Sequence, residues 1–188
     1  MPGRFKSFIN DLNEQERRAA EERAIENENR QRIADEFERH WQTVLQSLKQ
    51  TVFGCSIKGS PFEWVADSDG INVANVGLHW SRTENNGIPV VDLELGSPVG
   101  IQSFIIDQKK SLPPEVHLLS PVISNQEFCW QLGSRGKGVL GAEYTDYEVA
   151  DEIAMLLAQY ADEYEKLKVK FDPFANIQGS RSILTDEN

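Results

Sequence analysis

Cysteine, histidine and long apolar runs are scarce in this sequence. Its 188 residues include two cysteines, Cys55 and Cys129, and three histidines. Two cysteines do not make a disulfide framework, which favours a reducing compartment. No apolar run approaches the roughly 20 residues needed to span a bilayer, and the N-terminal residues contain no apolar signal core. These absences predict a cytoplasmic protein without a membrane partner.

Basic residues are also few, because 19 Lys and Arg stand against 30 Asp and Glu, giving a formal net charge of -11. Nucleic-acid surfaces need clustered Lys and Arg to contact phosphates, so we expect no nucleic-acid partner. The acidic balance would suit a basic protein partner, and it also favours solubility. No histidine lies within ligand spacing of a cysteine or of another histidine, so we expect no metal ion.

The region 11–53 has the pattern of one long helix or two collinear ones. Its first half has almost no large apolar side chain but places Glu four residues before Arg, as in Glu14 and Arg18, which stabilises a solvated helix. Its second half carries a stripe typical of a helix docked on a core: Ile33, Phe37, Trp41, Val44, Leu48 and Val52. We therefore predict an exposed charged helical extension over 1–32, an α+β domain over 33–170 and a flexible tail over 171–188.

The middle of the chain changes to the period of β-strands. Strands are predicted at Phe62–Ala66, at Ile71–Trp80, after the Asn85-Asn86-Gly87 turn, at Ile101–Ile106, after Pro113-Pro114 and at EFCWQL (127–132). A second helix is predicted from Thr145, which can form a capping box with Glu148. Its expected buried stripe is Val149, Ile153, Leu156, Tyr160, Tyr164 and Leu167. The sequence thus predicts an antiparallel sheet between a long N-terminal helix and a C-terminal helix.

Cys129 is the most informative residue for function. Strand alternation places Phe128, Trp130 and Leu132 on one face and puts Cys129 with Glu127 and Gln131 on the other. A structural cysteine prefers the apolar side, so this pattern makes Cys129 a candidate for a functional thiol. A helix or second polar layer over that face would instead make Cys129 structural. Cys55, between Gly54 and Ser56, is interpreted as a small packed side chain.

Several other patterns suggest chemistry less directly. Asp92 followed by Asp107-Gln108-Lys109 is similar to the carboxylate-lysine set of a magnesium nuclease, but the loose spacing and the acidic balance favour solvent-facing charges on strands instead. The run GSRGKGVLG, with Arg135 and Lys137, is interpreted as a flexible connection that would at most contact an anion. His40 and His117 are interpreted as surface or boundary residues, and no nucleophile-elbow signature accompanies them.

Read in order, residues from about 70 to 160 resemble the ubiquitin-conjugating enzyme family. The matching elements are Leu78-His79-Trp80, the double-proline turn Pro113-Pro114-Glu115-Val116 with the following HLLSPV, Glu127-Phe128-Cys129, and the helix positions Thr145, Val149, Ile153, Leu156 and Leu157. The family's His-Pro-Asn motif corresponds here to Ile123-Ser124-Asn125 in a shorter loop. The resemblance implies a four-stranded antiparallel meander between the two helices.

The resemblance also implies a mechanism and partners. Cys129 would accept the C-terminus of a ubiquitin-like protein from an activating enzyme as a thioester and pass it to an acceptor amine. Asn125 would stabilise the oxyanion that develops in that transfer, and no cofactor would be needed. Two alternatives remain open at this point: an inactive relative of the same fold that serves as a protein-binding scaffold, and a small acidic inhibitor of a basic protein. The N-terminal helix would contact the activating enzyme or mediate self-association.

Overall fold

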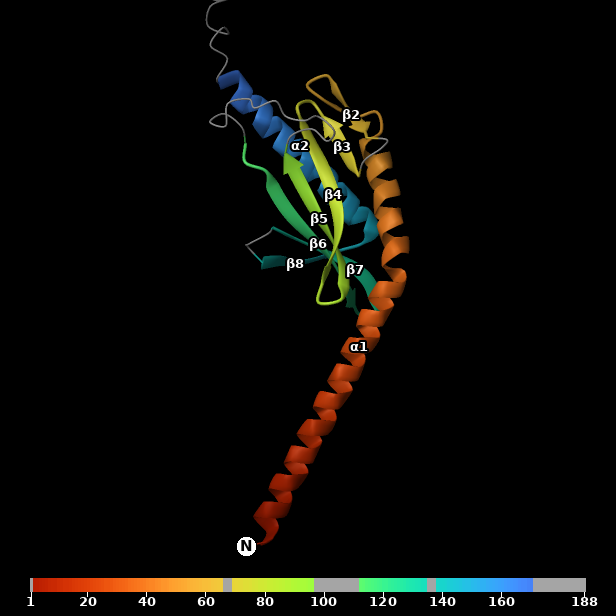
Figure 1. Cartoon of the computed structure of the whole chain (residues 1–188), viewed down its shortest axis with the longest axis vertical. Helices are drawn as coiled ribbons and strands as arrows, with labels where there is room; N and C mark the ends of the chain where they lie inside the picture. The colour runs from red at the N-terminus through yellow and green to blue at the C-terminus, as the bar shows by residue number, and fades with distance from the viewer. Residues whose placement is uncertain (1, 66–68, 97–111, 135–137, 171–188) are drawn as a thin grey trace, which may run out of the picture.

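The structure is a computed structural model that describes residues 2–65, 69–96, 112–134 and 138–170, with the backbone alone for 2–7, 10, 138–141 and 168–170. Its elements are α1 (Pro2–Val52), β1 (Ser56–Ile57), β2 (Ser60–Trp64), β3 (Gly70–Val73), β4 (Val76–Asn85), β5 (Ile88–Gly96), β6 (Glu115–Ser124), β7 (Glu127–Ser134), β8 (Gly138–Tyr144) and α2 (Asp146–Lys170). The predicted α+β class is confirmed. Figure 1 shows α1 running along one side of the sheet and far beyond it.

The strands form one antiparallel sheet in which each strand pairs with the next along the chain. The order is β1 to β8, so the sheet in the described part of the chain has eight strands. The prediction of a four-stranded meander is therefore wrong in its strand number. The meander connectivity itself is observed.

Two features of the sheet gave no recognisable sequence signal. The predicted strand Ile71–Trp80 is two strands, β3 and β4, which are joined at Ala74 and Asn75. Ala74 has a φ of 53°, a left-handed conformation that residues other than glycine rarely adopt. The residues from Gly138, predicted as part of a flexible connection, form β8 and pair with β7. The predicted strand at 101–106 lies outside the described residues.

Both helices pack on the same face of the sheet. Residues directly opposite each other in an antiparallel pair share a face, and the pairs Trp80–Leu93 and Val91–Leu119 are buried. Side chains from α1 and from α2 complete the same apolar cluster. The prediction that the sheet lies between the helices is thus wrong. The physical reason is that only one face of this sheet is apolar throughout, so both helices bury their stripes against it.

The buried stripe of α1 is the one predicted, while that of α2 is rotated. Every predicted core residue of α1 from Ile33 to Val52 is at most 8% exposed. On α2 the predicted Val149, Ile153 and Tyr160 are buried, but Leu156, Tyr164 and Leu167 are only partly buried. The core uses a neighbouring set in their place: Ala150, Leu157 and Ala161. Small alanines let α2 approach its neighbours closely, and a pattern based on large apolar residues overlooks them.

The start of α2 is fixed by the predicted capping box. The Thr145 backbone N–H donates to Glu148 Oε2 at 2.8 Å, and the Glu148 N–H donates to Thr145 Oγ1 at 3.3 Å. These bonds satisfy donors that the first helical turn cannot pair internally. The Thr145 N–H and the Thr145 hydroxyl both donate to Glu148 Oε2 and lower the pKa of the Glu148 carboxyl. Asp146 therefore occupies a defined position at the first turn of α2.

Residues 2–32 of α1, here called the arm, extend away from the domain. Ile33 is the first buried residue of α1, and the described side chains before it are exposed or half-buried. From Phe8 to Ile33 the helix rises about 38 Å at 1.5 Å per residue. Figure 1 shows this part of α1 leaving the sheet as a single unaccompanied helix.

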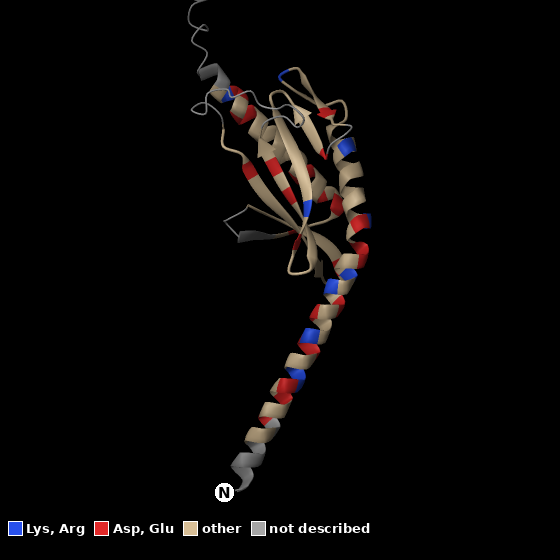
Figure 2. Ribbon diagram, in the orientation of Figure 1, with Lys and Arg blue, Asp and Glu red and all other residues tan. Residues whose placement is uncertain are grey.

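The arm packs against no other element along most of its length, and ion pairs between its own side chains stabilise it as a helix. Glu14 accepts hydrogen bonds from Arg17 at 2.9 Å and from Arg18 at 3.0 Å, and Glu26 accepts one from Arg30 at 2.6 Å. Figure 2 shows acidic and basic residues interspersed along this helix. Each such pair stabilises an exposed helix slightly. Together they support a helix whose middle has little apolar surface to bury.

Replacing Glu14 with glutamine at pH 6 is expected to raise amide hydrogen-exchange rates around residues 13–18 by about twofold per pair lost. The two guanidinium groups lower the pKa of Glu14. A lowered pKa means that the stabilisation is present above the ordinary Glu pKa of about 4.3 and is lost as pH falls through the lowered value. The matched control is Glu16→Gln, because Glu16 has no ion pair among the described residues. Equal exchange rates in the two variants would contradict this assignment.

Candidate functional site

Cys129 is the third residue of β7 (Glu127–Ser134) and lies on the face opposite the helices. β7 pairs with β6 on one side and with β8 on the other, and Cys129 lies directly opposite Val122 of β6. Its neighbours Phe128 and Trp130 are buried under the helices, at 8% and 0% exposure. Cys129 itself is a free, half-buried thiol. The predicted alternation along this strand is therefore observed.

The electrostatic surroundings of Cys129 hold its thiol in the protonated form. Burial raises the pKa of the Cys129 thiol, and the nearby carboxylates of Glu143, Glu127, Asp146 and Glu148 raise this pKa further. A thiolate is the reactive form of cysteine, and catalytic thiols normally lie in electropositive surroundings. Within the described residues, no cation is among the groups that shift the pKa of this thiol.

Asn125 lies at the tip of the hairpin that joins β6 to β7. Asn125 and Gln126 have φ angles of 49° and 67° and form a two-residue turn closed by the pair Ser124–Glu127. Asparagine is favoured in such left-handed positions. The geometry of the turn is therefore enough to explain why an asparagine occupies position 125. Cys129 is two strand residues beyond Glu127, or about 7 Å along the strand. Within the described chain, neither side chain makes a hydrogen bond, so the structure does not join the two predicted catalytic residues.

Alkylation of Cys129 by iodoacetamide is expected to be slower at pH 7 than that of cysteine in an unstructured peptide. The raised pKa leaves little thiolate, so the rate should keep rising above the ordinary Cys pKa of about 8.5. Mass spectrometry of the Cys129 peptide measures the rate against pH. Glu143→Gln should move the profile to lower pH, because the Glu143 carboxylate contributes to the raised pKa. An unchanged profile in that variant would refute the electrostatic explanation.

A polar junction that sequence reasoning missed joins α1, β7 and α2. Asp146 Oδ1 accepts a hydrogen bond from Trp130 Nε1 at 2.8 Å, and Asp146 Oδ2 lies 2.8 Å from His40 Nδ1. An ionised carboxylate only accepts, so His40 Nδ1 carries the proton. The His40 ring also stacks on Phe128, with centroids 4.0 Å apart and planes at 3°. His40 was predicted as a boundary residue, and this role agrees with its 17% side-chain exposure.

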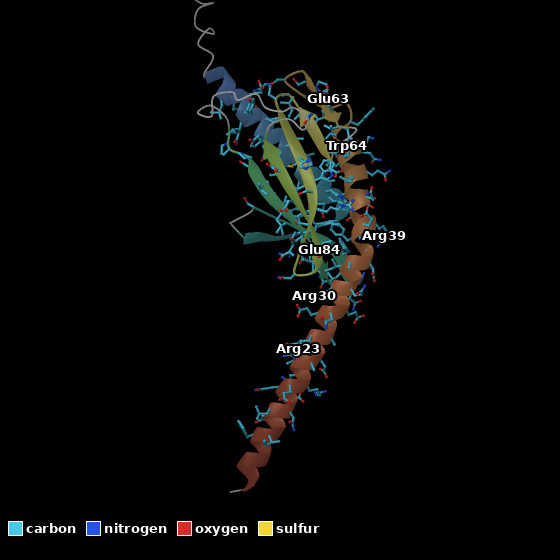
Figure 3. The ribbon with its side chains drawn as sticks, in the orientation of Figure 1. Arg23, Arg30, Arg39, Glu63, Trp64 and Glu84 are labelled. Atoms are coloured by element: carbon cyan, nitrogen blue, oxygen red, sulfur yellow. The ribbon has the colours of Figure 1, made fainter. Side chains whose placement is uncertain are left out.

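The junction lies where the arm leaves the domain. Arg32 donates to the backbone oxygen of Gln126 at 2.9 Å, which ties the end of the arm to the β6–β7 hairpin. Arg39 Nη2 lies 3.1 Å from His40 Nε2 and 2.9 Å from Glu36 Oε2. Figure 3 labels Arg39 on α1 at the level of the sheet, with Arg30 and Arg23 farther along the arm. Of these contacts, the bond from Arg32 to Gln126 joins α1 to the sheet and so holds the arm at the β6–β7 hairpin.

The remaining predicted candidates are dispersed. Cys55 is exposed, and its Sγ lies 3.4 Å from the Thr51 backbone oxygen, so the prediction of a packed side chain is wrong. Asp92 accepts a hydrogen bond from Thr83 Oγ1 at 3.3 Å on the helix-free face. His117 contacts Glu115 at 3.3 Å. The motif members at 107–109 and 135–137 and the predicted tail at 171–188 lie outside the described residues. No group able to hold a metal occurs in the described part.

Two shallow hollows are present on the described surface. One, of about 200 Å³, lies at the β4–β5 hairpin and is lined by Thr83, Glu84, Asn85, Val90, Asp92 and Leu118. The other, of about 320 Å³, lies between β8 and α2 and is lined by Glu143, Tyr144, Glu148, Asp151 and Glu152. The second is strongly acidic. Neither has the mostly apolar lining with a few placed polar groups that is typical of a ligand pocket.

Comparisons with known proteins identify no relative of this chain. No family model, no curated protein and no solved structure matches the chain. Among the described residues, neither helix is long and apolar enough to cross a membrane. The functional argument therefore depends on the geometry of the chain itself.

Proposed function

We propose that this chain is a protein-binding scaffold in which the arm presents a docking surface at a distance from the α+β domain. The observation that carries the proposal is the exposed apolar group near the end of the arm. Phe8, Ile9 and Leu12 are 58%, 38% and 40% exposed, although each is a residue type that normally lies in a core. Their spacing places them on one side of the helix.

The physical properties of the arm suit a spacer. Its middle is held helical by its own ion pairs, so it needs no packing partner along its length. An apolar helix side of this kind can bind a groove through anchors at spacings of three and four residues. The formal charge of -11 favours a basic partner by steering the encounter. A continuous helix then holds that partner about 38 Å from the domain.

A capture experiment in the organism that encodes the chain tests the scaffold function. Proteins that associate with the tagged full-length chain are compared with those of a Phe8→Glu, Leu12→Glu variant by quantitative mass spectrometry. The control is Ile25→Glu, because Ile25 is equally exposed at 59% but lies on another side of the same helix. A set of proteins retained by wild type and by the control, and lost from the double variant, supports the scaffold. Identical sets from all three would overturn it.

A second proposal follows from the partly accessible thiol on the helix-free face of the sheet. In this proposal the chain has a ubiquitin-conjugating-like fold, and Cys129 accepts a ubiquitin-like C-terminus from an activating enzyme. The Cys129 sulfur would replace the activating enzyme's sulfur in the thioester, and an acceptor amine would then displace Cys129 as the restored thiol. Asn125 would serve the oxyanion only after movement of the β6–β7 hairpin. Two free cysteines support the cytoplasmic location that this chemistry needs.

A thioester assay distinguishes the two proposals. The full chain is incubated with ATP, an activating enzyme and its ubiquitin-like protein, and the products are separated without reductant. An adduct that thiols cleave, and that persists in Cys55→Ser but not in Cys129→Ala, supports transfer. Absence of any adduct with every activating enzyme of the source organism would refute the second proposal while leaving the scaffold untouched.

A further inference from the structure

The strand β8 forms one margin of the sheet, and its outer side is open. The strand order places β7 on one side of β8 and no described strand on the other, and Figure 1 shows β8 at the margin of the sheet. An edge strand presents unpaired backbone N–H and C=O groups on its outer side. In the described part of the chain, no backbone group from outside the sheet bonds to β8. This side of β8 can therefore accept a further strand.

The two margins of the sheet differ in how well they are protected. β1, at the opposite margin, has only two residues, a length that limits pairing with another chain. β8 has seven residues, Gly138–Tyr144, which span about 23 Å when extended. Its sequence contains neither Lys nor Pro, which are common protective residues of edge strands. A register shift between Gln131 and Gly133 bends the pairing of β7 with β8 locally. Strand addition is thus favoured at β8 rather than at β1.

The acidic hollow of about 320 Å³ lies beside this open margin. Its described lining combines Glu143 and Tyr144 at the end of β8 with Glu148, Asp151 and Glu152 of α2. The lining includes no described residue of β7, so the hollow lies toward the outer side of β8. Glu143 and Glu152 have no hydrogen bond or ion pair to any other described residue. A chain that pairs with β8 would consequently pass beside several carboxylates, two of them unpaired.

Met155 adds an apolar group to the acidic side of α2. Glu148, Glu152 and Met155 are spaced four and three residues apart, so they lie on one side of the helix. The Met155 side chain is 52% exposed. A lysine side chain has an apolar stem and a charged head. A surface that offers a thioether beside carboxylates is therefore suited to lysine.

We propose that β8 and the acidic hollow together bind an extended basic segment of a partner protein, which adds to the sheet as a further strand. Backbone hydrogen bonds to β8 supply affinity, and alternate side chains of the segment supply specificity because they share one face of a strand. Lys or Arg at every second position places positive charge beside Glu148 and Glu152. This surface lies on the domain and does not use the arm, so the inference goes beyond the scaffold function proposed above.

A second copy of this chain is a poor occupant of the same margin. If β8 strands of two copies paired edge to edge, an acidic hollow from each copy would lie beside the pairing, and its described lining contains no basic residue. Like charges brought together across paired strands are destabilising. A basic segment brings the opposite charge instead. Its binding should weaken as salt is added.

Fluorescence anisotropy with a synthetic peptide tests the proposal on the full chain. The probe is a short labelled peptide with Lys at every second position and Val between, and the matched probe carries Glu in place of each Lys. We expect the Lys peptide to bind and the Glu peptide not to bind. Glu143→Lys combined with Glu152→Lys should weaken binding of the Lys peptide about tenfold or more. The control is Glu63→Lys combined with Glu84→Lys, which changes the net charge equally at exposed residues of β2 and β4 and should bind as wild type does. Figure 3 labels both control residues.

A second measurement uses the wild-type chain, so it does not depend on the folding of any variant. Two versions of the Lys peptide are N-methylated, one at the Lys positions and the other at the Val positions. The N–H groups of alternate residues in a strand point to opposite edges, so only one version loses its bonds to β8. That version is expected to bind about tenfold or more weakly, because several backbone hydrogen bonds are lost together. The other version should bind nearly as the parent peptide does.

Four results would overturn the proposal. Failure of the Lys peptide to bind removes the basic segment as occupant. Equal binding by the two N-methylated versions shows that no strand is added. Equal weakening in the control variant shows a general attraction to an acidic protein rather than a site. A chain that dimerises in sedimentation velocity and excludes the peptide assigns this margin to a second copy. Phe8→Glu combined with Leu12→Glu should leave peptide binding unchanged, so this inference and the scaffold function can fail separately.

Discussion

Trp130→Ala is expected to lower the free energy of unfolding by about 3 to 5 kcal/mol, the usual cost of removing a buried aromatic side chain. Trp130 is fully buried and forms edge-to-face contacts with Phe37, Trp41 and Phe128. The substitution would leave a cavity where α1 meets the sheet, and the surrounding rings could fill it only in part. Chemical denaturation followed by far-ultraviolet circular dichroism measures the change.

Trp130→Phe is the matched variant. It keeps an aromatic ring in the core but removes the indole N–H that donates to Asp146. Its expected cost is about 1 to 2 kcal/mol, since one hydrogen bond to a charged group and a small volume are lost. If Trp130→Ala were no more damaging than Trp130→Phe, the aromatic cluster would not be the main support of the helix-sheet contact.

Asp146→Ala is expected to cost about 2 to 4 kcal/mol of unfolding free energy, because it leaves two donors at once without an acceptor. Those donors are the buried Trp130 indole and the ring of His40. Part of the loss arises because an acidic residue in the first turn also stabilises α2 through its dipole, worth about 0.3 to 1 kcal/mol. Thermal and chemical denaturation at neutral pH measure the total.

Asp151→Ala provides the control for Asp146. Asp151 lies on the same helix, is exposed and accepts one hydrogen bond from Thr51 at 2.9 Å. Its removal should cost within about 0.5 kcal/mol. A double variant with His40→Ala should be less destabilised than the sum of the two single changes, because both remove the same contact. Full additivity would mean that the His40–Asp146 contact contributes nothing to the docking of α1 on α2.

Local signals made much of the fold predictable. The stripe of α1 from Ile33 to Val52, the capping box at Thr145 and the alternation around Cys129 are all set by residues near one another in sequence. Periodicity and side-chain hydrogen bonding act over such short ranges. These features could therefore be predicted without knowledge of the tertiary structure.

The features that could not be predicted from the sequence depend on contacts between residues far apart in the chain. The layering of both helices on one face depends on how eight strands pair, and the turn at Ala74 contains neither glycine nor proline. The junction of His40 with Asp146 joins residues 106 positions apart, so no spacing rule reveals it. The candidate thiol was found by alternation, but the carboxylates that raise its pKa come from β8 and α2 as well as from its own strand.

The contact between α1 and α2 has a consequence for how the chain is made in the cell. α1 leaves the ribosome before α2, yet side chains of both helices complete one core, and Thr51 contacts Asp151 while His40 contacts Asp146. During synthesis the sheet can pair strand by strand, but Trp41 and its neighbours stay incompletely covered until translation passes α2. A stalled or truncated nascent chain would hence expose an aromatic-rich surface, a typical substrate for chaperones and proteases.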